Sequence, residues 1–235
     1  MHSSHAKIKN ILIVAAAGFG KRMELSYPKQ FLEYKGKPLF LYSLLTGEKS
    51  DKIHGIIIIT QKENIDKIYD VCKENNIKKV LDIVQGGKER QESIFNGIKA
   101  IERIKNLDKK PIIFVQDSVR PFFKEKYIEM SLEELDKNNE LSGVIIGVPV
   151  KDTIKVVNDN GIITSTPERK SLMAANTPQV FRYEILKKAY DDAQNIKFLG
   201  TDDSSLIERI GGKVEVIIGD YDNIKITTPE DLKFI

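Results

Sequence analysis

Small residues and cations that together could hold a polyphosphate gather near the start of this sequence. The segment ILIVAAAGFGKRMELSYPKQ, residues 11–30, passes from an apolar run into small residues and then reaches Lys21, Arg22 and Lys29. Where little beyond backbone separates a ligand from the chain, backbone N–H groups can point at phosphate oxygens. Cations beside them neutralise charge as a phosphate bond breaks. The segment therefore predicts a site that grips a triphosphate.

Three other interpretations of this glycine turn have to be weighed. A plain turn between a core strand and a helix, with solvated lysines, is the simplest. A dinucleotide-binding turn is disfavoured because the third small residue is missing after Gly20. In addition, the apolar run 56–59 is followed by Thr60 and Gln61 rather than by a ribose-binding acid. A Walker loop is excluded because no Gly-Lys-Ser/Thr closes the turn.

A second glycine turn and a carboxylate follow two further predicted strands. Gly86 and Gly87 open a helix with Ser93 in its first turns, and such a turn can approach a base or ribose closely. A plain strand-to-helix turn remains the alternative. Asp117 directly follows an apolar run, where a carboxylate could help hold Mg²⁺ on a triphosphate. Arg120 could fork onto a phosphate, or could form an internal ion pair with Asp117.

Two more polar clusters lie toward the C-terminus. The first spans a charged hairpin and the segment after it, and either solvates a surface or contacts a ligand. It comprises Lys151, Asp152, Thr153, Lys155, Arg169 and residues 176–179. Residues 201–204 can cap a helix without any catalytic role. The second cluster, residues 222–227, brings Asp222 and Lys225 near the last predicted strand, where they could complete a metal and phosphate site.

The elements that must position these residues alternate regularly, which indicates an α/β fold. Short apolar runs and amphipathic stretches in alternation predict a mostly parallel sheet covered on both faces. Ligands of such sheets bind beyond the carboxyl ends of the strands. The predicted strands are residues 11–14, 56–60, 80–84, 112–115, 143–148 and 214–218, and the predicted helices are residues 39–47, 64–74, 90–104, 126–138, 183–194 and 203–210, with a further helix start at Thr228.

The stretch 151–166 differs from the rest because it reads as strand, turn and strand. Residues 158–161 (Asn-Asp-Asn-Gly) supply the turn, so a projecting β-hairpin is predicted. An isolated hairpin is only marginally stable in water, so this one should pack on something, and a partner subunit is a reasonable candidate.

Composition restricts the class of protein. A chain of 235 residues with 41% hydrophobic content can bury a sizeable core, and we expect one domain over residues 6–235. The net charge of +3 favours small anionic ligands over nucleic acid as the main partner. One cysteine, Cys72, excludes a disulfide framework and fits a reducing compartment. Without a membrane-length apolar run or a signal-peptide core, we expect a soluble cytoplasmic protein.

The N-terminal residues 1–5 are expected to be a disordered or expression-derived terminus, although they carry His2 and His5. Because the body of the chain has no cysteine or histidine pair at ligand spacing, a structural zinc site is not expected.

Eight motifs in order resemble those of the 2-C-methyl-D-erythritol 4-phosphate cytidylyltransferase family, over nearly the whole chain after Ile11. They are AAAGFGKRM (15–23), PKQ (28–30), GGKERQES (86–93), QDSVRPF (116–122), PVKDTIK (149–155), ANTPQVF (175–181), TDDSSLIE (201–208) and DNIKITTPEDL (222–232). The resemblance implies a Rossmann-like, GT-A-like nucleotidyltransferase with a mixed, mostly parallel sheet. It also implies a homodimer joined through a projecting β-arm, residues 150–168.

The implied reaction joins CTP and 2-C-methyl-D-erythritol 4-phosphate into a CDP-alcohol and pyrophosphate, with Mg²⁺ as cofactor. The resemblance assigns roles residue by residue. Arg22 and Lys29 correspond to the catalytic cations. The implied CTP contacts are Ala16, Ala17, Gly18, Phe19, Gly20, Gly87, Lys88, Ser93, Asp117, Ser118 and Lys225; the implied polyol phosphate contacts are Asp117, Arg120, Thr153, Arg169, Thr177, Thr201 and Lys225; and the implied metal ligands are Asp117 and Asp222.

The chain departs from the family pattern at two motifs. Gln116 and Val119 stand where the family often has histidine and alanine, and Lys88 stands where an acidic residue often follows the glycine pair. Valine before Arg-Pro also occurs in ribitol-5-phosphate cytidylyltransferases, which are the main alternative, and PVKDTIK and TDDSSLIE favour the methylerythritol enzymes. A non-catalytic nucleotide-binding protein is the alternative of another class, and the retention of Arg22 and Lys29 disfavours it.

Overall fold

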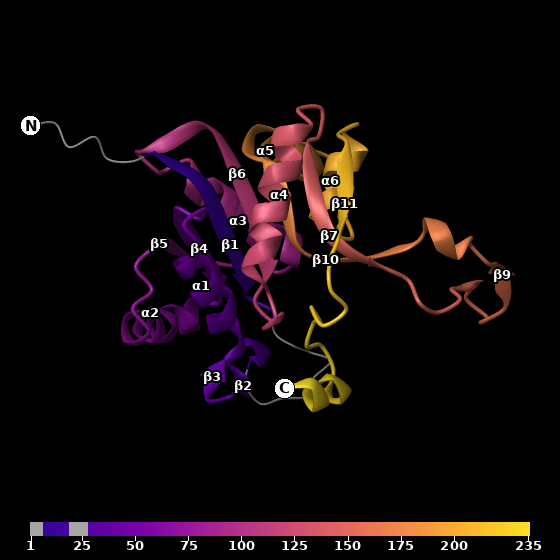
Figure 1. Ribbon diagram of the computed structural model, residues 1–235, viewed down its shortest axis with the longest axis horizontal. Coiled ribbons are helices and arrows are strands. Elements are labelled where there is room, and N and C mark those ends of the chain that lie inside the picture. Colours follow the sequence, from indigo (N-terminus) through magenta and orange to yellow (C-terminus); the bar gives the residue numbers. More distant parts are fainter. Residues whose placement is uncertain (1–6, 19–27) are drawn as a thin grey trace, which may run out of the picture.

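The computed structural model of the chain describes residues 7–18 and 28–235 (Figure 1). These residues form a seven-stranded sheet in the order β11-β7-β10-β6-β1-β4-β5. Every neighbouring pair is parallel except at β10, which is antiparallel to both β6 and β7. The expected mixed, mostly parallel sheet is confirmed. Its strands are β1 (Ile8–Ala16), β4 (Gly55–Thr60), β5 (Val80–Gln85), β6 (Leu107–Asp117), β7 (Gly143–Pro149), β10 (Met173–Arg182) and β11 (Val214–Ile218).

Helices cover both faces of this sheet, and alternation along β1 explains why. Successive side chains of a strand point to opposite faces. Ile11 and Ile13 therefore pack into the core with α3, α5 and α6, whereas Leu12 and Val14 pack into the core with α1, α2 and α4. The helices are α1 (Leu39–Lys49), α2 (Ile65–Glu74), α3 (Arg90–Ile101), α4 (Glu125–Lys137), α5 (Tyr183–Asn195) and α6 (Asp203–Arg209).

Strand β10 is a difference from the sequence-based prediction, which placed no strand between the hairpin and the helix at Tyr183. Its sequence MAANTPQVFR contains a proline and several small or polar residues, which strands disfavour. The ladder with β7 shifts register between Ala175 and Gln179. Beyond that shift, Val180 and Phe181 are fully buried on opposite faces of the sheet. Tertiary packing of this apolar pair outweighs the weak local preference.

The remaining predicted strands and helices are present with shifted ends. Strand β1 continues to Ala16, two residues beyond the predicted end, and the helix predicted to reach residue 104 ends at Ile101. The helix start at Thr228 becomes a short 3-10 helix, Pro229–Phe234, in which Thr228 and Asp231 cap each other. A small hairpin of β2 (Glu33–Tyr34) and β3 (Lys37–Pro38) was not predicted. In the described parts of the chain, no helix is long and apolar enough to cross a membrane.

The predicted hairpin is present as β8 (Val156–Val157) and β9 (Ile163–Ser165), and it extends away from the sheet (Figure 1). The Asn158 side-chain oxygen accepts hydrogen bonds from the backbone N–H groups of Asn160 and Ile162, which closes the turn. Every residue from 151 to 166 is exposed, including Ile162 at 63% and Ile163 at 57%. We refer to residues 150–168 as the arm.

The base of the arm is fastened to the body of the protein. Tyr221 donates a hydrogen bond from its hydroxyl to the Pro149 carbonyl oxygen at 2.9 Å, and the Lys151 ammonium lies 3.7 Å from the centre of the Tyr221 ring. Arg169 donates a hydrogen bond to the Lys151 carbonyl oxygen at 3.0 Å. These contacts set the direction in which the arm leaves the sheet.

Candidate active site

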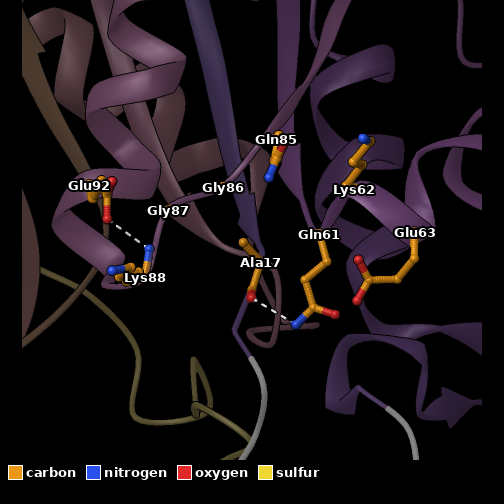
Figure 2. A pocket seen from close by; sticks show the side chains of 9 residues that line it. All are labelled: Ala17, Gln61, Lys62, Glu63, Gln85, Gly86, Gly87, Lys88 and Glu92. Carbon is orange, nitrogen blue, oxygen red and sulfur yellow. Dashed lines mark hydrogen bonds between the residues drawn. The ribbon is translucent and has the colours of Figure 1, made fainter.

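Three adjoining cavities lie along the edge of the sheet where the parallel strands β1, β4, β5 and β6 end. The first, of about 340 Å³, lies between the end of β1 and the turn after β5 (Figure 2). The second, of about 100 Å³, shares Ala17 with the first and lies in front of Asp117. The third, of about 340 Å³, shares Arg90, Asp117 and Lys225 with the second. Together they form one groove centred on Asp117.

Asp117 is the last residue of β6, and it is almost completely buried in a cluster of cations. Its carboxylate oxygens lie 3.2 Å from Arg90 Nε, 2.7 Å from Lys225 Nζ and 3.9 Å from Arg120 Nε. Its backbone N–H donates a hydrogen bond to the Thr177 hydroxyl at 3.2 Å. Burial alone would raise the pKa of the Asp117 carboxyl, but Arg90, Lys225 and Arg120 together hold it well below its usual range. Asp117 is therefore a fixed negative charge.

Arg90, the first residue of α3, links Asp117 to a second buried carboxylate. Its guanidinium contacts Asp203 Oδ2 at 2.8 Å, and Asp203 also accepts a hydrogen bond from the Tyr190 hydroxyl. Burial would lower the pKa of Arg90, but Asp203 and Asp117 outweigh it and raise that pKa well above its usual value. Gln179 accepts hydrogen bonds from the backbone N–H groups at the start of α6, which fixes Asp203. Arg90 is held from two sides and cannot turn away.

The charges of this cluster leave the groove attractive to anions. Two buried carboxylates, Asp117 and Asp203, face the cations Arg90, Arg120 and Lys225, and Lys29 adds another cation to the lining of the second cavity. The Arg120 Nε atom is buried and makes no hydrogen bond within the described residues. The second cavity is lined by three cations, Lys29, Arg90 and Lys225, against the single carboxylate of Asp117, and this excess of positive charge raises the local concentration of phosphate ligands.

The glycine turn after β5 closes the first cavity, and its small residues are required by packing. A Cβ atom on Gly86 would lie 2.4 Å from the Cβ of Ala17, so only glycine allows this approach to the end of β1. Ser93 accepts a hydrogen bond from the Gly87 N–H at 3.0 Å and donates one to the Glu89 carbonyl oxygen. The Lys88 N–H donates to the Glu92 carboxylate at 2.7 Å (Figure 2).

Most of the site residues expected from the sequence line this groove. Ala17, Gly87 and Lys88 line the first cavity, and Ala17, Gly18, Lys29, Ser93, Asp117, Ser118 and Lys225 line the second. The third is lined by Asp117, Arg120, Thr177, Thr201 and Lys225. Ala16 differs from the expectation in one respect, because it is the last residue of β1, is 1% exposed, and lines none of the three cavities. The turn therefore begins at Ala17, and the role of Ala16 as a CTP contact stays a prediction.

Three other expected residues line none of the three cavities, and three more lie outside the described residues. Thr153 and Arg169 lie on the exposed arm and its return segment. Asp222 forms an ion pair with Lys124 at 2.8 Å at the start of α4, and it lines none of the three cavities. Phe19, Gly20 and Arg22 lie outside the described residues, as do residues 1–5.

The sequence interpretation missed Arg90 and the role of Gln61. The sequence predicts no role for Arg90 within the GGKERQES motif, because its partner Asp203 lies 113 positions further along the chain. One signal could have found it. Arg90 is the first residue of a helix, where the helix dipole disfavours a cation, so an arginine there indicates a carboxylate partner. Gln61, which replaces the acid expected of a dinucleotide fold, lines the first cavity.

The described residues contain no group of three or more histidine, cysteine or acidic side chains that could hold a metal ion by themselves. Asp117 supplies one carboxylate in the groove. Mg²⁺ commonly binds through one or two carboxylates together with water and substrate phosphates. The residues present therefore fit a metal ion that arrives with a triphosphate, with Asp117 as protein ligand.

Comparison with known proteins gives one consistent result. The family model for 2-C-methyl-D-erythritol 4-phosphate cytidylyltransferase matches residues 10–235. A protein of that name from Fusobacterium nucleatum is 52% identical over the full length of both chains, and one from Bacillus licheniformis is 44% identical over 94% of this chain and 91% of its own. The crystal structure of a 4-diphosphocytidyl-2C-methyl-D-erythritol synthase from Anaerococcus prevotii superposes with a TM-score of 0.82 at 32% identity, covering 96% of this chain and 93% of the other.

Replacing Asp117 by asparagine is expected to destabilise the fold by about 3 kcal/mol at pH 7, because the buried Arg120 and the half-buried Arg90 and Lys225 lose their counter-charge. The folded-state pKa of Asp117 is depressed, so its contribution is present above the unfolded-state pKa of about 3.9 and is lost as the pH falls below it. Urea unfolding of Asp117→Asn and wild type should therefore show a gap that is constant above pH 5 and narrows below about pH 4.

Asp191→Asn is the matched control, since Asp191 is an exposed partner of Lys187 and its loss should cost less than about 1 kcal/mol. An equally small effect of both substitutions would contradict the central place of Asp117 in the cluster.

Proposed function

The chain belongs to the 2-C-methyl-D-erythritol 4-phosphate cytidylyltransferase family and is a nucleotidyltransferase, and we propose that the groove around Asp117 is where it works. The reaction joins CTP and 2-C-methyl-D-erythritol 4-phosphate, giving 4-diphosphocytidyl-2-C-methyl-D-erythritol and pyrophosphate. One observation carries the assignment of the site: a buried carboxylate, Asp117, holds three cations where the second cavity meets the third.

In this proposal CTP occupies the first two cavities. The nucleoside lies beside Gly87 and Lys88, and the triphosphate lies along Ala17 and Gly18 with Lys29 beside it. The polyol phosphate occupies the third cavity, where Arg120 and Thr201 line the wall and can contact it. Arg90, Asp117 and Lys225 line both sides of the boundary, which is where the two phosphates must meet.

The transfer is a single in-line displacement. A phosphate oxygen of the polyol phosphate forms a bond to the α-phosphorus of CTP, while the bond from that phosphorus to the oxygen that bridges it to the β-phosphorus breaks. That oxygen leaves as a terminal oxygen of pyrophosphate. A phosphate monoester is already a competent nucleophile, so no side chain has to remove a proton. The chain contributes positioning and stabilisation of negative charge, for which Arg22, Lys29 and Lys225 are suited by their charge.

Lys225 is well suited to hold the nucleophile because its position is already fixed before substrate binds. Its ammonium lies 2.7 Å from Asp117, and the adjacent Ile226 N–H donates to the Val119 carbonyl oxygen at 2.9 Å. Asn223 anchors the same segment by donating to the Thr177 carbonyl oxygen. A cation held in place by the fold needs little reorganisation when charge develops on phosphate.

We further propose Mg²⁺ as cofactor, held by the CTP phosphates with Asp117 as protein ligand. When bound, such an ion neutralises charge on the triphosphate and on the leaving pyrophosphate. Asp222 is a second candidate ligand, although it would have to leave Lys124 to take part.

The arm supports the proposal that the chain forms a homodimer. Exposed apolar side chains such as Val157, Ile162 and Ile163 call for a covering surface, and a second copy of the chain would supply it. Thr153 and Arg169 would then contact the polyol phosphate in the partner's groove.

We also propose that the protein works in the cytoplasm. Cys72 is a buried free thiol, and burial raises its pKa to about 11, which fits a reducing compartment and a structural role.

The test of the function is a comparison of two acceptors. Purified protein with CTP and Mg²⁺ should release pyrophosphate with 2-C-methyl-D-erythritol 4-phosphate and do so poorly with ribitol 5-phosphate. Equal or faster turnover with ribitol 5-phosphate would instead favour a ribitol-5-phosphate cytidylyltransferase. CTP binding without any product from either acceptor would favour a non-catalytic binding protein.

Removing Lys29 should affect the chemical step. Lys29→Ala is expected to lower kcat by about 100-fold, because a cation aimed at the developing charge is lost, and Arg22→Ala should behave similarly. Lys52→Ala is the control, since Lys52 is exposed and its ammonium pairs with the neighbouring Asp51 at 3.6 Å, away from the three cavities. Steady-state kinetics that show a raised KM for CTP with an unchanged kcat would rule out this role for Lys29.

A site shared between subunits predicts rescue in mixed dimers. Arg169→Ala and Lys29→Ala proteins should each be nearly inactive, because each disrupts every site. After subunit exchange at equal concentrations, about a quarter of wild-type activity should return, because half of the dimers are hybrid and each has one intact site. Native mass spectrometry would verify the exchange. No recovery in exchanged dimers would mean that each groove is completed by its own chain.

A further inference from the structure

The backbone that leaves β1 is held by two glutamine side chains that no step above uses. Gln30 donates from Nε2 to the Ala16 carbonyl oxygen at 2.6 Å, and Gln61 donates from Nε2 to the Ala17 carbonyl oxygen at 3.2 Å. Gln30 is 1% exposed and Gln61 is 8% exposed. Figure 2 shows the second bond as a dashed line between the Gln61 amide nitrogen and the Ala17 carbonyl oxygen.

These bonds fix the direction of the next N–H groups as well. A peptide group is planar and trans, so its N–H points opposite to its C=O. The Ala16 carbonyl shares a peptide group with the Ala17 N–H, and the Ala17 carbonyl shares one with the Gly18 N–H. When Gln30 and Gln61 hold the two oxygens, they also aim the two N–H groups, and both Ala17 and Gly18 line the cavity in front of Asp117.

Each glutamine is itself locked in place. The Gln61 side-chain oxygen accepts a hydrogen bond from Asn64 Nδ2 at 3.2 Å, so its amide nitrogen must face Ala17. Phe31, next to Gln30, packs edge-on against Phe40 with ring centroids 5.5 Å apart, and the Lys67 ammonium lies 4.1 Å from its ring centre. The two residues that follow Lys29 in the short helix Lys29–Phe31 are therefore both held in place.

We infer that Gln30 and Gln61 are positioning residues for the phosphate-binding backbone at Ala17 and Gly18, with Gln30 also placing Lys29. This inference rests on the proposed function of the groove. An amide is suited to the task because it donates to a carbonyl without adding charge, whereas a lysine or arginine there would compete for the phosphate. It also explains why a glutamine, rather than an acid, follows β4: a carboxylate would repel the Ala17 carbonyl oxygen.

The experiment measures the binding of two fragments, Mg²⁺-pyrophosphate and cytidine, to Gln30→Met and Gln61→Met by NMR titration. Methionine keeps the length of the side chain and removes the donor. Both variants should bind pyrophosphate about tenfold more weakly and cytidine within about twofold of wild type, because only the phosphate-facing N–H groups lose their aim. Gln30→Met should in addition lower kcat by more than Gln61→Met does.

Asn75→Leu is the matched control, because Asn75 also donates from a side-chain amide to a backbone carbonyl, that of Val71 at 2.9 Å, at the end of α2. It should lower the melting temperature without changing either affinity. If the glutamine variants behave like this control, they are merely structural and the inference is wrong.

An equal loss of cytidine and pyrophosphate affinity in Gln61→Met would also overturn the inference, since Gln61 would then contact the nucleoside directly. Should Gln30→Met fail to fold, Gln61→Met at the cavity wall decides the question alone. Failure of the proposed function is separate, because wild-type protein would then release no pyrophosphate from CTP and polyol phosphate, whatever the variants bind.

Discussion

The ion cluster around Asp117 is the interaction on which the rest of the structure depends. A carboxylate buried this deeply would be strongly destabilising without partners. Its partners come from three separate segments: Arg90 from the start of α3, Arg120 from the turn after β6, and Lys225 from the segment beyond β11. They can meet only because the parallel strands end at one edge of the sheet, so the topology and the electrostatics require each other.

The antiparallel strand β10 makes this edge asymmetric. On the side of β1 and β4 the groove is built from short turns with small residues, such as Gly86 packed against Ala17. On the side of β10, Thr177 accepts the Asp117 N–H and Gln179 fixes the start of α6. One side therefore presents backbone and the other side presents polar side chains. In the proposed placement, the nucleotide binds on the side that presents backbone and the polyol phosphate binds on the side that presents polar side chains.

The sequence predicts those features that depend on local pattern. Apolar runs such as residues 56–60 predict strands buried on both faces, and Asp117 lies at the end of a strand, β6, as expected. Its contact with a ligand stays a prediction. The sequence failed where long-range packing decides. Strand β10 exists because Val180 and Phe181 bury on opposite faces, although Pro178 argues against a strand. The role of Arg90 depends on Asp203, and Asp222 pairs with Lys124 instead of approaching Asp117, because no periodicity reports on partners so distant in the chain.

The arm has a consequence for a single copy of the chain. Its exposed Ile162 and Ile163 are the kind of apolar surface on which unrelated chains aggregate. Yet β8 has two residues and β9 has three, so neither offers an edge long enough for a foreign strand to extend. The arm thus exposes apolar side chains without exposing a strand edge long enough for backbone pairing with another chain. A single copy of the chain therefore carries less risk of extending into a fibril through its arm.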